Sequence, residues 1–431
     1  MPNGTAESSN SGHLRCFRAT PAFRSMSESC LVRQPVFGTS GALKGYEVRY
    51  RDSEDGRQAL IQSFISGTYD LVRGASPAFL PCTREQLVEN AFDLVDPSTT
   101  ILLMPRTISA DADVVEAIAR YRDAGGFIAL DGLDADESTS EQLLPYATWA
   151  RVDVRVSDSA VLERTCNRVK RANAGLKLLA QHVTHAIEYA VAQRLGFDAF
   201  QGSFFSSFEP VPSTDMPQST VAAMRLLGLA RDVNVNDRKL EEVLETDPVL
   251  TFQLLRLVNS AAVGMRGVSS IGQALRLIGR TTFQRWLAVA VAASRKTSTG
   301  VDRELVRQAV QRGRMLEQLG GAGRDAGTLF LVGLFSQLDA VFRMSLPEIL
   351  ERVVLSDEAT GALLDRTGPY ADALSFAESY EMGMFEYAAD LAKDMGIDPA
   401  RVGELYTNAL RWTEEALGTL GEAQPATAGR R

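Results

Sequence analysis

The 431-residue chain has little of what metal-dependent or redox chemistry usually requires. It contains only three histidines, His13, His182 and His185. Its four cysteines are widely scattered and form no CxxC pair, which disfavours a zinc site or a redox motif. A GxxxxGK[ST] phosphate loop, a GxSxG nucleophile turn and an HExxH zinc motif are also missing. We therefore expect no cofactor and no metal.

Long apolar runs are missing as well. The longest, at residues 286–293 and 329–335, fall far short of the roughly 18 residues that span a bilayer. Residues 1–30 are rich in Ser, Asn and Gly, lack the apolar stretch of a signal peptide, and are expected to form a disordered tail. The net charge of −9 argues against a broad nucleic-acid-binding surface. We expect a cytoplasmic protein that binds neither membranes nor nucleic acid.

The composition is that of a globular protein, with 45% hydrophobic and 23% charged residues, and the length predicts two domains. Residues 31–206 alternate short apolar runs with helical segments, which is an α/β pattern. The strand candidates are residues 100–104, 127–131, 149–154 and 177–180. This spacing predicts a parallel sheet closed into a TIM-like barrel.

The pattern changes after a linker at residues 207–213 that contains two prolines. Residues 214–417 show helical periodicity without a convincing strand. Asp247 and Pro248 have the pattern of an N-cap followed by proline in the first helical turn. An apolar stripe then runs to Val258, and a second one ends at Gly279. We predict an all-α second domain and a flexible tail at residues 418–431.

The second half resembles the HDOD domain, an all-α relative of the HD phosphohydrolases. The resemblance rests on Thr246-Asp247-Pro248, on LLRLVNSA at residues 254–261 and on IGQALRLIG at residues 271–279. HD enzymes hold their metals with His and Asp side chains, but all three histidines precede this domain. The resemblance therefore implies an interaction module.

The first half resembles the EAL domain, the barrel phosphodiesterase of cyclic di-GMP. The matching segments are RQPV at residues 33–36, GYEVRYR at 45–51, ALD at 129–131 and QGSFF at 201–205. The combination of EAL and HDOD domains in one chain of about this length is a known bacterial signalling family. The resemblance therefore predicts a barrel followed by a helical HDOD domain.

The EAL resemblance implies oxygen ligands for metal ions at the mouth of the barrel. Glu47 and Asp131 match two of the family's acidic residues, and EVR stands where the family has EAL. The family's catalytic Lys falls on Arg151, which presents a planar fork and is not equivalent. The other family ligands fall on Pro81, Leu103, Gly132 and Gln181. These departures predict a degenerate barrel that is not an enzyme.

A remnant of the nucleotide pocket is still expected at the barrel mouth. Gln34, Arg51 and Gln201 match positions that face the nucleotide in the family, and Arg51 could pair with a phosphate. The remnant pocket as a whole comprises Gln34, Glu47, Arg51, Asp131, Asp153 and Gln201. Each of the three matching residues also has a structural explanation: Arg51 as an ion-pair partner, and the glutamines as satisfied polar groups at strand ends.

The sequence thus predicts a signalling adaptor that works by binding other, unidentified signalling proteins in cyclic di-GMP-related regulation. One alternative is an effector that binds cyclic di-GMP without hydrolysing it. Another is a residual phosphodiesterase in which Glu47, Asp131 and Asp153 hold a metal. A basic, open barrel mouth would favour the effector, whereas a mouth filled by Leu103 and its neighbours would count against it. The oligomeric state is left open.

Two weaker motifs have structural explanations. His182 and His185 lie three apart on a predicted helix and could share a metal, but no third ligand is evident. Residues 321–326 fit GxGxxA but follow a helical pattern rather than a strand. The alternatives are an ordinary helix turn for His182 and His185 and a helix-to-helix loop for residues 321–326.

Overall fold

The computed structural model describes residues 30–420 except 52–53, 134–138, 156–158, 207–217, 233, 260–267, 269, 295–298, 321–324 and 354. The expected N-terminal tail, the expected linker and most of the expected C-terminal tail lie outside the described residues. None of the helices in the described part of the chain combines the length and hydropathy that a membrane span requires.

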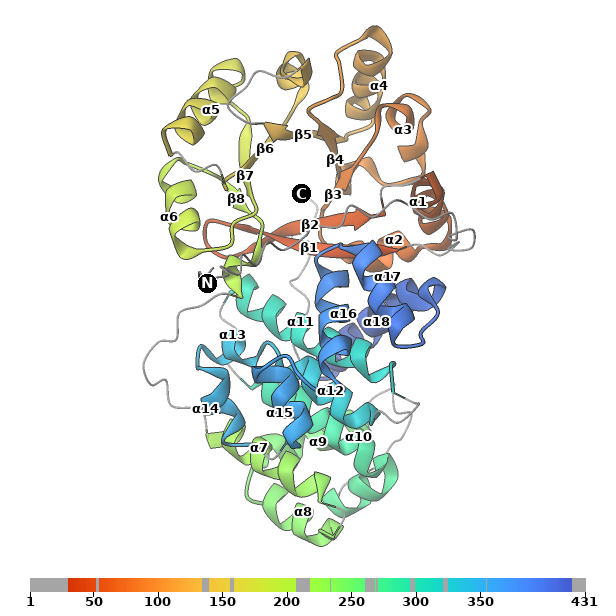
Figure 1. The fold of residues 1–431 in the computed structure, drawn as a ribbon, viewed down its shortest axis with the longest axis vertical. Helices are drawn as coiled ribbons and strands as arrows, with labels where there is room; N and C mark the ends of the chain where they lie inside the picture. Colours follow the sequence, from red (N-terminus) through yellow and green to blue (C-terminus); the bar gives the residue numbers. More distant parts are fainter. Residues whose placement is uncertain are drawn as a thin grey trace, which may run out of the picture.

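The first half forms a closed barrel in the strand order β1 to β8 (Figure 1). Its strand β1 runs antiparallel to both β2 and β8, and the other neighbouring pairs are parallel. The bounds are β1 Leu31–Gly38, β2 Leu43–Tyr50, β3 Ala78–Pro81, β4 Thr100–Pro105, β5 Phe127–Leu133, β6 Trp149–Asp153, β7 Lys177–Gln181 and β8 Ala199–Phe200. The predicted barrel is confirmed, and its four predicted strands correspond to β4 to β7.

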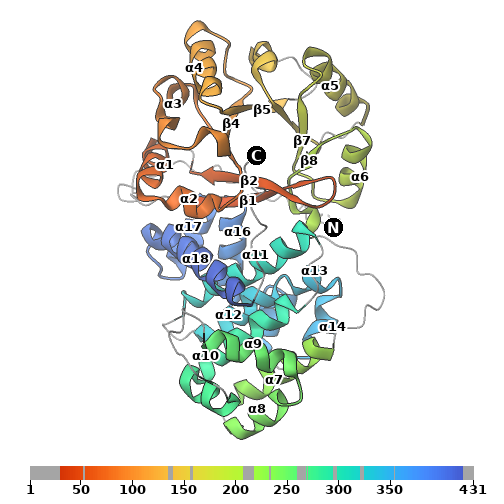
Figure 2. The same cartoon turned by 180° about the vertical axis from the view of Figure 1, so that it is seen from behind.

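Helices surround most of the barrel, as the views from the front and from behind show (Figures 1 and 2). They are α1 Glu54–Ser66, α2 Thr68–Arg73, α3 Arg84–Val88, α4 Ala112–Asp123, α5 Ser159–Ala172 and α6 Ala186–Arg194, with short 3-10 turns η1 Ala91–Leu94, η2 Pro97–Thr99, η3 Thr139–Tyr146 and η4 Ser203–Phe205. The barrel interior is a small apolar cluster of Val36, Phe79, Ile101, Leu103, Ala129, Leu179 and Ala199. Because apolar side chains fill this interior, polar chemistry is confined to the mouth.

The second half is entirely helical in its described part, which confirms the predicted all-α domain. Its elements are α7 Gln218–Arg231, α8 Asp237–Leu244, α9 Pro248–Val258, α10 Ile271–Ala293, α11 Gly300–Glu317, α12 Ala326–Phe335, α13 Leu338–Phe342, α14 Leu346–Leu350, α15 Asp357–Leu364, α16 Ala371–Glu381, α17 Phe385–Asp394, η5 Pro399–Arg401 and α18 Val402–Leu420. Asp247 accepts the Leu250 amide at 3.0 Å, as its predicted capping role requires. Gly279 interrupts α10 with φ of 73°, a left-handed conformation that glycine adopts readily.

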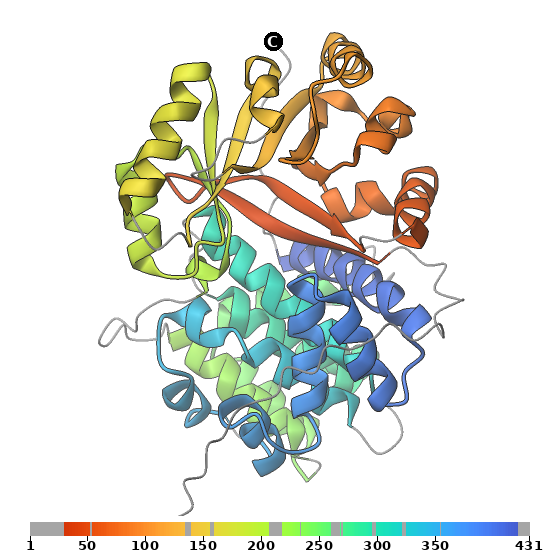
Figure 3. The ribbon, with the colours of Figure 1, turned by 45° about the horizontal axis from the view of Figure 1, so that its top comes forward.

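The two halves meet along the outer face of the β1–β2 hairpin (Figures 1 and 3). Consecutive antiparallel strands need no crossover helix, so this face of the barrel is covered by α11, α16 and α18 instead. The amide of Val301, in the first turn of α11, donates to the Gly41 carbonyl at 3.1 Å. A Cβ at Gly300 would lie only 2.6 Å from the Leu43 amide nitrogen. The hairpin and the start of α11 are therefore in main-chain contact.

Buried polar groups reinforce this contact. The Tyr46 hydroxyl on β2 donates to Glu304 on α11 at 2.8 Å. The Arg33 guanidinium on β1 lies over the Tyr46 ring and pairs with Glu414 on α18 at 3.1 Å. The Tyr406 hydroxyl of α18 accepts the Arg33 amide at 3.2 Å. Since these groups are buried, they need one another as hydrogen-bond partners, and the barrel and the helices are expected to hold a fixed relative position.

Candidate functional site

The mouth of the barrel is organised around Arg151 on β6, whose side chain is only 4% exposed. Its Nε and Nη2 atoms each donate to an oxygen of Asp131 on β5 at 2.6 Å. Its Nη1 atom lies 2.8 Å from Glu47 Oε1 on β2. The planar guanidinium binds two carboxylates from separate strands, because its N–H donors point in several fixed directions. The single ammonium group of a lysine lacks this fixed set of donors.

A chain of amides continues from this ion cluster toward the helical domain. Gln201, just after β8, donates to Glu47 and also to the Gln34 side-chain oxygen at 3.2 Å. Gln34 on β1 in turn donates to the Glu381 main-chain carbonyl at the end of α16, at 3.1 Å. The polar groups of the barrel mouth and the helical domain therefore form one connected network.

Charge at the mouth is balanced within this network. Burial raises the pKa of Glu47, but the attraction of Arg151 and the hydrogen bonds from Gln201 and Arg151 outweigh it, so that the pKa lies below its ordinary value. Burial alone would lower the pKa of Arg151, but Glu47 and Asp131 raise it above its ordinary value. Arg151 and Glu47 are both charged at neutral pH.

The EAL resemblance implies divalent metals at this mouth. Within the described ranges, no three His, Cys, Asp or Glu side chains converge closely enough to hold a metal ion. The oxygens of Glu47 and Asp131 that would serve as ligands are bonded to Arg151 instead. The donor set in this arrangement does not fit the divalent metals that the resemblance implies.

The positions that depart from the family pattern have local structural roles. Gly132 adopts φ of 70° where the pairing of β5 with β6 shifts its register, so glycine suits this backbone. Pro81 ends β3, and its carbonyl accepts the Tyr50 hydroxyl at 3.3 Å. Leu103 packs in the apolar interior cluster.

Two predicted pocket residues are engaged elsewhere. The Arg51 Nε atom pairs with Glu386 on α17 at 3.0 Å. Asp153 pairs with Arg155 at 2.6 Å and with His182 Nδ1 at 3.0 Å. Burial raises the pKa of Asp153, but the hydrogen bonds from Arg155 and the nearby His182 lower it to about 2. Of the six predicted residues, the structure brings together Gln34, Glu47, Asp131 and Gln201.

The two weaker sequence motifs differ in outcome. The predicted helix at residues 182–185 is wrong, because α6 begins only at Ala186 and His182 has φ of 59°. His185 precedes the helix in an extended conformation. Residues 321–324 of the GxGxxA segment lie outside the described residues, and the segment falls between α11 and α12, where a helix-to-helix loop was expected.

A cavity of about 680 Å³ lies between the barrel mouth and the helical domain. Strand β1 pairs with β8 at Phe37 and Gly38, and beyond this pairing Gln34 of β1 is joined to Gln201 through their side chains. The cavity wall combines Gln34, Glu47, Arg49 and Gln201 of the barrel with Gln308, Gln311, Gln337 and Met382 of the helical domain. Leu103 is not among its lining residues and packs in the apolar interior cluster instead.

Arg49 lines this wall and was not among the residues that the sequence analysis proposed for the pocket. Its Nη1 atom donates to the Met382 main-chain carbonyl at 2.8 Å. Among the described residues, no carboxylate lies within ion-pair distance of it, whereas Arg51 pairs with Glu386. The alternation of β2 places Arg49 on the same strand face as Glu47, which was the signal available in the sequence.

A turn of the helical domain closes one side of the cavity. This α16–α17 turn, residues 381–384, receives hydrogen bonds from Gln34 and Arg49 through its main-chain carbonyls. Glu381 itself is bound by Arg312 of α11, with Nη2 to Oε2 at 2.5 Å. The turn therefore joins the barrel mouth to the interior of the helical domain.

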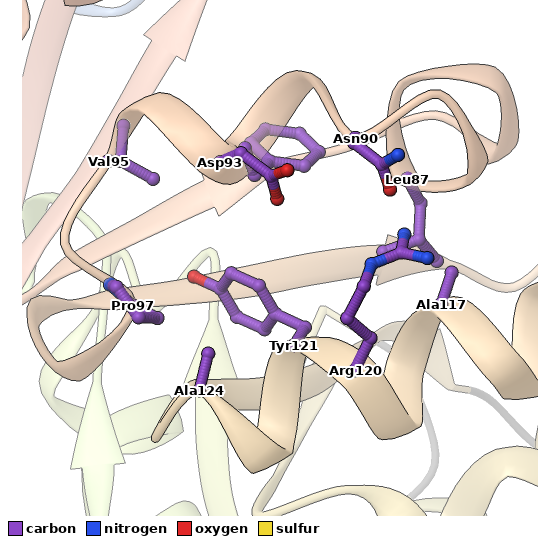
Figure 4. Close-up of a pocket in the computed structure, with 10 residues that line it drawn as sticks. Leu87, Asn90, Asp93, Val95, Pro97, Ala117, Arg120, Tyr121 and Ala124 are labelled. Carbon is purple, nitrogen blue, oxygen red and sulfur yellow. The ribbon is translucent and has the colours of Figure 1, made fainter.

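A second, smaller pocket of about 170 Å³ lies on the barrel exterior, between η1 and α4 (Figure 4). Asn90, Asp93, Arg120 and Tyr121 surround it. The Tyr121 hydroxyl is committed to the Thr100 carbonyl at 2.9 Å. At this volume the pocket is below the usual size of a ligand site, and the larger cavity is the candidate site.

Comparisons with known proteins give a family match in the helical half and two relatives that align over most of the chain. Residues 216–367 match the HDOD domain. The cyclic di-GMP phosphodiesterase CdgJ of Vibrio cholerae is 25% identical over 420 residues, which cover 92% of this chain and 95% of that protein. The uncharacterized protein YuxH of Bacillus subtilis is 25% identical over 402 residues, 89% of this chain and 97% of its own length. The structure of a standalone EAL protein of Vibrio cholerae O395 in its c-di-GMP-bound form covers 40% of this chain and 88% of its own, at 16% identity and a TM-score of 0.34.

One prediction is contradicted by these findings. The sequence departures led us to expect that the chain is not an enzyme, but a relative aligned over 92% of the chain is named a phosphodiesterase. The expectation assumed that ligand positions could be carried over from the EAL motif one by one. At 25% identity, a motif comparison does not decide whether an active site is lost.

The fold class predicted from the sequence, a barrel followed by a helical region with an HDOD domain, is confirmed. The N-terminal half is a closed eight-stranded barrel, and the helical half contains the matched HDOD domain. The relatives align over nearly the full length of this chain, through both halves. The chain therefore combines an eight-stranded closed barrel with a matched HDOD domain, and it is similar over most of its length to a protein named a cyclic di-GMP phosphodiesterase.

Proposed function

We propose that this protein binds cyclic di-GMP in the cavity at its barrel mouth and that its HDOD domain conveys the bound state to other signalling proteins. The observation that carries the proposal is the composition of the cavity wall. Gln34, Gln201 and Arg49 line the cavity together, and the Arg49 guanidinium donates to the Met382 carbonyl while its charge also acts on the buried Glu47. Such a wall offers hydrogen bonds to a base and a positive charge to a phosphate.

The size and position of the cavity support the proposal. Its volume of about 680 Å³ falls within the range of small-molecule sites, roughly 300–1,000 Å³. It opens at the mouth of a barrel, where ligand sites of this architecture lie. The name of the Vibrio cholerae relative gives the same nucleotide as that protein's substrate.

The contacts of Arg49 suggest how the bound state would reach the HDOD domain. A phosphate that accepts hydrogen bonds from Arg49 competes with the Met382 carbonyl for the same guanidinium. Loss of that bond frees one of the links that hold the α16–α17 turn against the barrel. A ligand that binds more tightly when the turn is released would then increase the fraction of molecules with a released turn.

Hydrolysis of the bound nucleotide is the second candidate function, and the name of the relative favours it. It would occur at the same mouth, near Glu47 and Asp131. Both carboxylates are tied to Arg151, so the reaction requires an arrangement in which at least one of them is released.

The proposal is tested by titrating the purified chain with cyclic di-GMP in a calorimeter. The same samples are then analysed by chromatography for a linear product, which reports hydrolysis directly. Hydrogen exchange of the amides at residues 381–386, with and without the nucleotide, reports the relay. We expect saturable binding and faster exchange in the turn. Absence of heat at millimolar nucleotide would refute the binding proposal, and unchanged exchange would refute the relay.

A further inference from the structure

All four carboxylate oxygens of Glu47 and Asp131 have a donor supplied by the chain itself. The two Asp131 oxygens accept the Nε and Nη2 atoms of Arg151, each at 2.6 Å. Glu47 Oε1 lies 2.8 Å from Arg151 Nη1, and Glu47 Oε2 accepts the side-chain amide of Gln201. Carboxylate oxygens are the ligands that a divalent metal ion prefers. A metal can therefore bind at these two side chains only by displacing donors that are already in place.

Arg151 is buried and uses all three of its guanidinium nitrogen atoms. Nε and Nη2 bind Asp131, and Nη1 reaches both Glu47 and, at 3.4 Å, the side-chain oxygen of Gln201. A guanidinium stays charged in proteins, whereas a buried lysine can lose its proton. An approaching divalent ion would meet this fixed positive charge, and its entry would leave the guanidinium buried without partners, which is strongly unfavourable. The cluster in this arrangement therefore excludes a metal ion.

The charge that a divalent ion would bring is supplied by two arginines. One guanidinium carries half the charge of a divalent metal ion. The second positive charge comes from Arg49, which lies on the same strand as Glu47 and acts on that buried carboxylate. Arg49 lines the cavity, whereas Arg151 is not among its lining residues. The inner charge therefore holds the carboxylates, and the outer charge stands where a ligand can reach it.

We infer that Arg151 is the resident cation of the barrel mouth: its guanidinium takes the place of a divalent metal ion between Glu47 and Asp131, so that these carboxylates bind no metal. This inference goes beyond the proposed function, because it concerns the cation of the mouth and holds whether or not a nucleotide binds. It has a positive consequence. Removal of the guanidinium leaves two carboxylates without their cation, and such a pair, completed by water, is a donor set that Mn²⁺ accepts.

Titration of the full chain with Mn²⁺ alone, followed through the paramagnetic resonance signal of the free ion, tests the inference. The variants are Arg151→Ala and a control, Arg155→Ala, which frees the carboxylate of Asp153 by removing an exposed arginine. We expect Arg151→Ala to bind one Mn²⁺ with a Kd at least about tenfold below that of any binding by the wild type. Arg155→Ala should behave as the wild type does. Adding Asp131→Asn to Arg151→Ala should abolish the gain.

Thermal unfolding gives a second readout. Mn²⁺ should raise the Tm of Arg151→Ala and leave that of the wild type unchanged, because only the variant binds the ion in its folded state. Arg151→Gln, which also removes the charge, serves if the alanine variant does not fold. Saturable Mn²⁺ binding by the wild type that Asp131→Asn removes would overturn the inference, as would a folded Arg151 variant that gains no binding. A wild type that binds no cyclic di-GMP would overturn only the proposed function.

Discussion

Arg151 and Asp131 form a two-point ion pair across adjacent strands of the barrel, with both nitrogen–oxygen distances at 2.6 Å. Asp131 belongs to β5 and Arg151 to β6, and Glu47 on β2 completes the cluster. The guanidinium is thereby fixed at the centre of the mouth, and its charge contributes to the lowered pKa of Glu47. Gln201 donates a hydrogen bond to Glu47 of this cluster, and it also donates to the side-chain oxygen of Gln34.

Removal of Arg151 should be costly for the fold. In Arg151→Met the buried Glu47 loses its main cationic partner, and breaking a buried pair in this way costs about 3–5 kcal/mol. Urea unfolding of the variant should show a loss of that size. Arg155→Met is the matched control, because the Arg155 side chain is 57% exposed and its pair with Asp153 should contribute less than about 1 kcal/mol. Equal losses in the two variants would show that the cluster around Arg151 is not a buried pair in solution.

Acid should weaken the fold through Glu47. Its pKa is lowered in the folded chain, whereas in the unfolded chain it titrates near the ordinary value of 4.5. As the pH falls below the pKa of the unfolded state, the unfolded chain therefore takes up a proton that the folded chain does not. The stabilisation that the ionised Glu47 provides above this pKa is lost as the pH falls through the lower pKa of the folded state. We expect Glu47→Gln to lose less stability than the wild type between about pH 5 and pH 3.

The control for this pH experiment is Glu386→Gln, which removes a carboxylate paired with Arg51 at the surface. Its denaturation midpoints should follow the wild-type pH dependence. If Glu47→Gln and the wild type lose stability in parallel over this range, folding does not lower the pKa of Glu47.

Much of the fold follows from local sequence patterns. Short apolar runs with helical spacers predicted β4 to β7, and Asp247 with Pro248 predicted the start of α9, because strands and helix caps depend on residues within a few positions of one another. The predicted helix at His182 failed because a left-handed residue there ends the strand segment, and histidine gives no strong signal of that conformation.

The candidate site was harder to predict because its parts are distant in the sequence. The motif identified Gln34, Glu47, Asp131 and Gln201, which meet in the structure. It also favoured Arg51 as the phosphate contact, but that guanidinium pairs with Glu386, which lies 335 residues later. Similarly, only the folded chain shows that the Arg49 guanidinium donates to the Met382 carbonyl, 333 residues later. Such contacts depend on domain docking, which no local pattern encodes.

Docking of the two domains should depend on the absence of a side chain at Gly300. A Cβ there would lie 2.6 Å from the Leu43 nitrogen and 2.8 Å from the Gly41 oxygen, and main-chain atoms cannot move aside as a flexible side chain can. Gly300→Ala should therefore destabilise the chain by about 1–3 kcal/mol. It should also speed hydrogen exchange in the β1–β2 hairpin.

Gly418→Ala provides the comparison for that variant. Gly418 lies in α18, where a Cβ would have no neighbouring atom within 4 Å, and alanine is the better helix former there. This variant should be neutral or stabilised by up to about 1 kcal/mol. Equal thermal midpoints for the two variants would contradict the close contact of α11 with the hairpin.

The central claim is that cyclic di-GMP binds at the barrel mouth through Arg49. It is tested most directly by calorimetric titration of the wild type, Arg49→Met and Arg120→Met with cyclic di-GMP in the presence of EDTA. Arg120 belongs to the small exterior pocket (Figure 4) and controls for loss of one positive charge. The account predicts metal-independent binding that weakens at least about tenfold in Arg49→Met, since a hydrogen bond to a charged group is worth about 1.5–3 kcal/mol, and that is unchanged in Arg120→Met. Equal affinities for all three proteins, or no binding by the wild type, would contradict it.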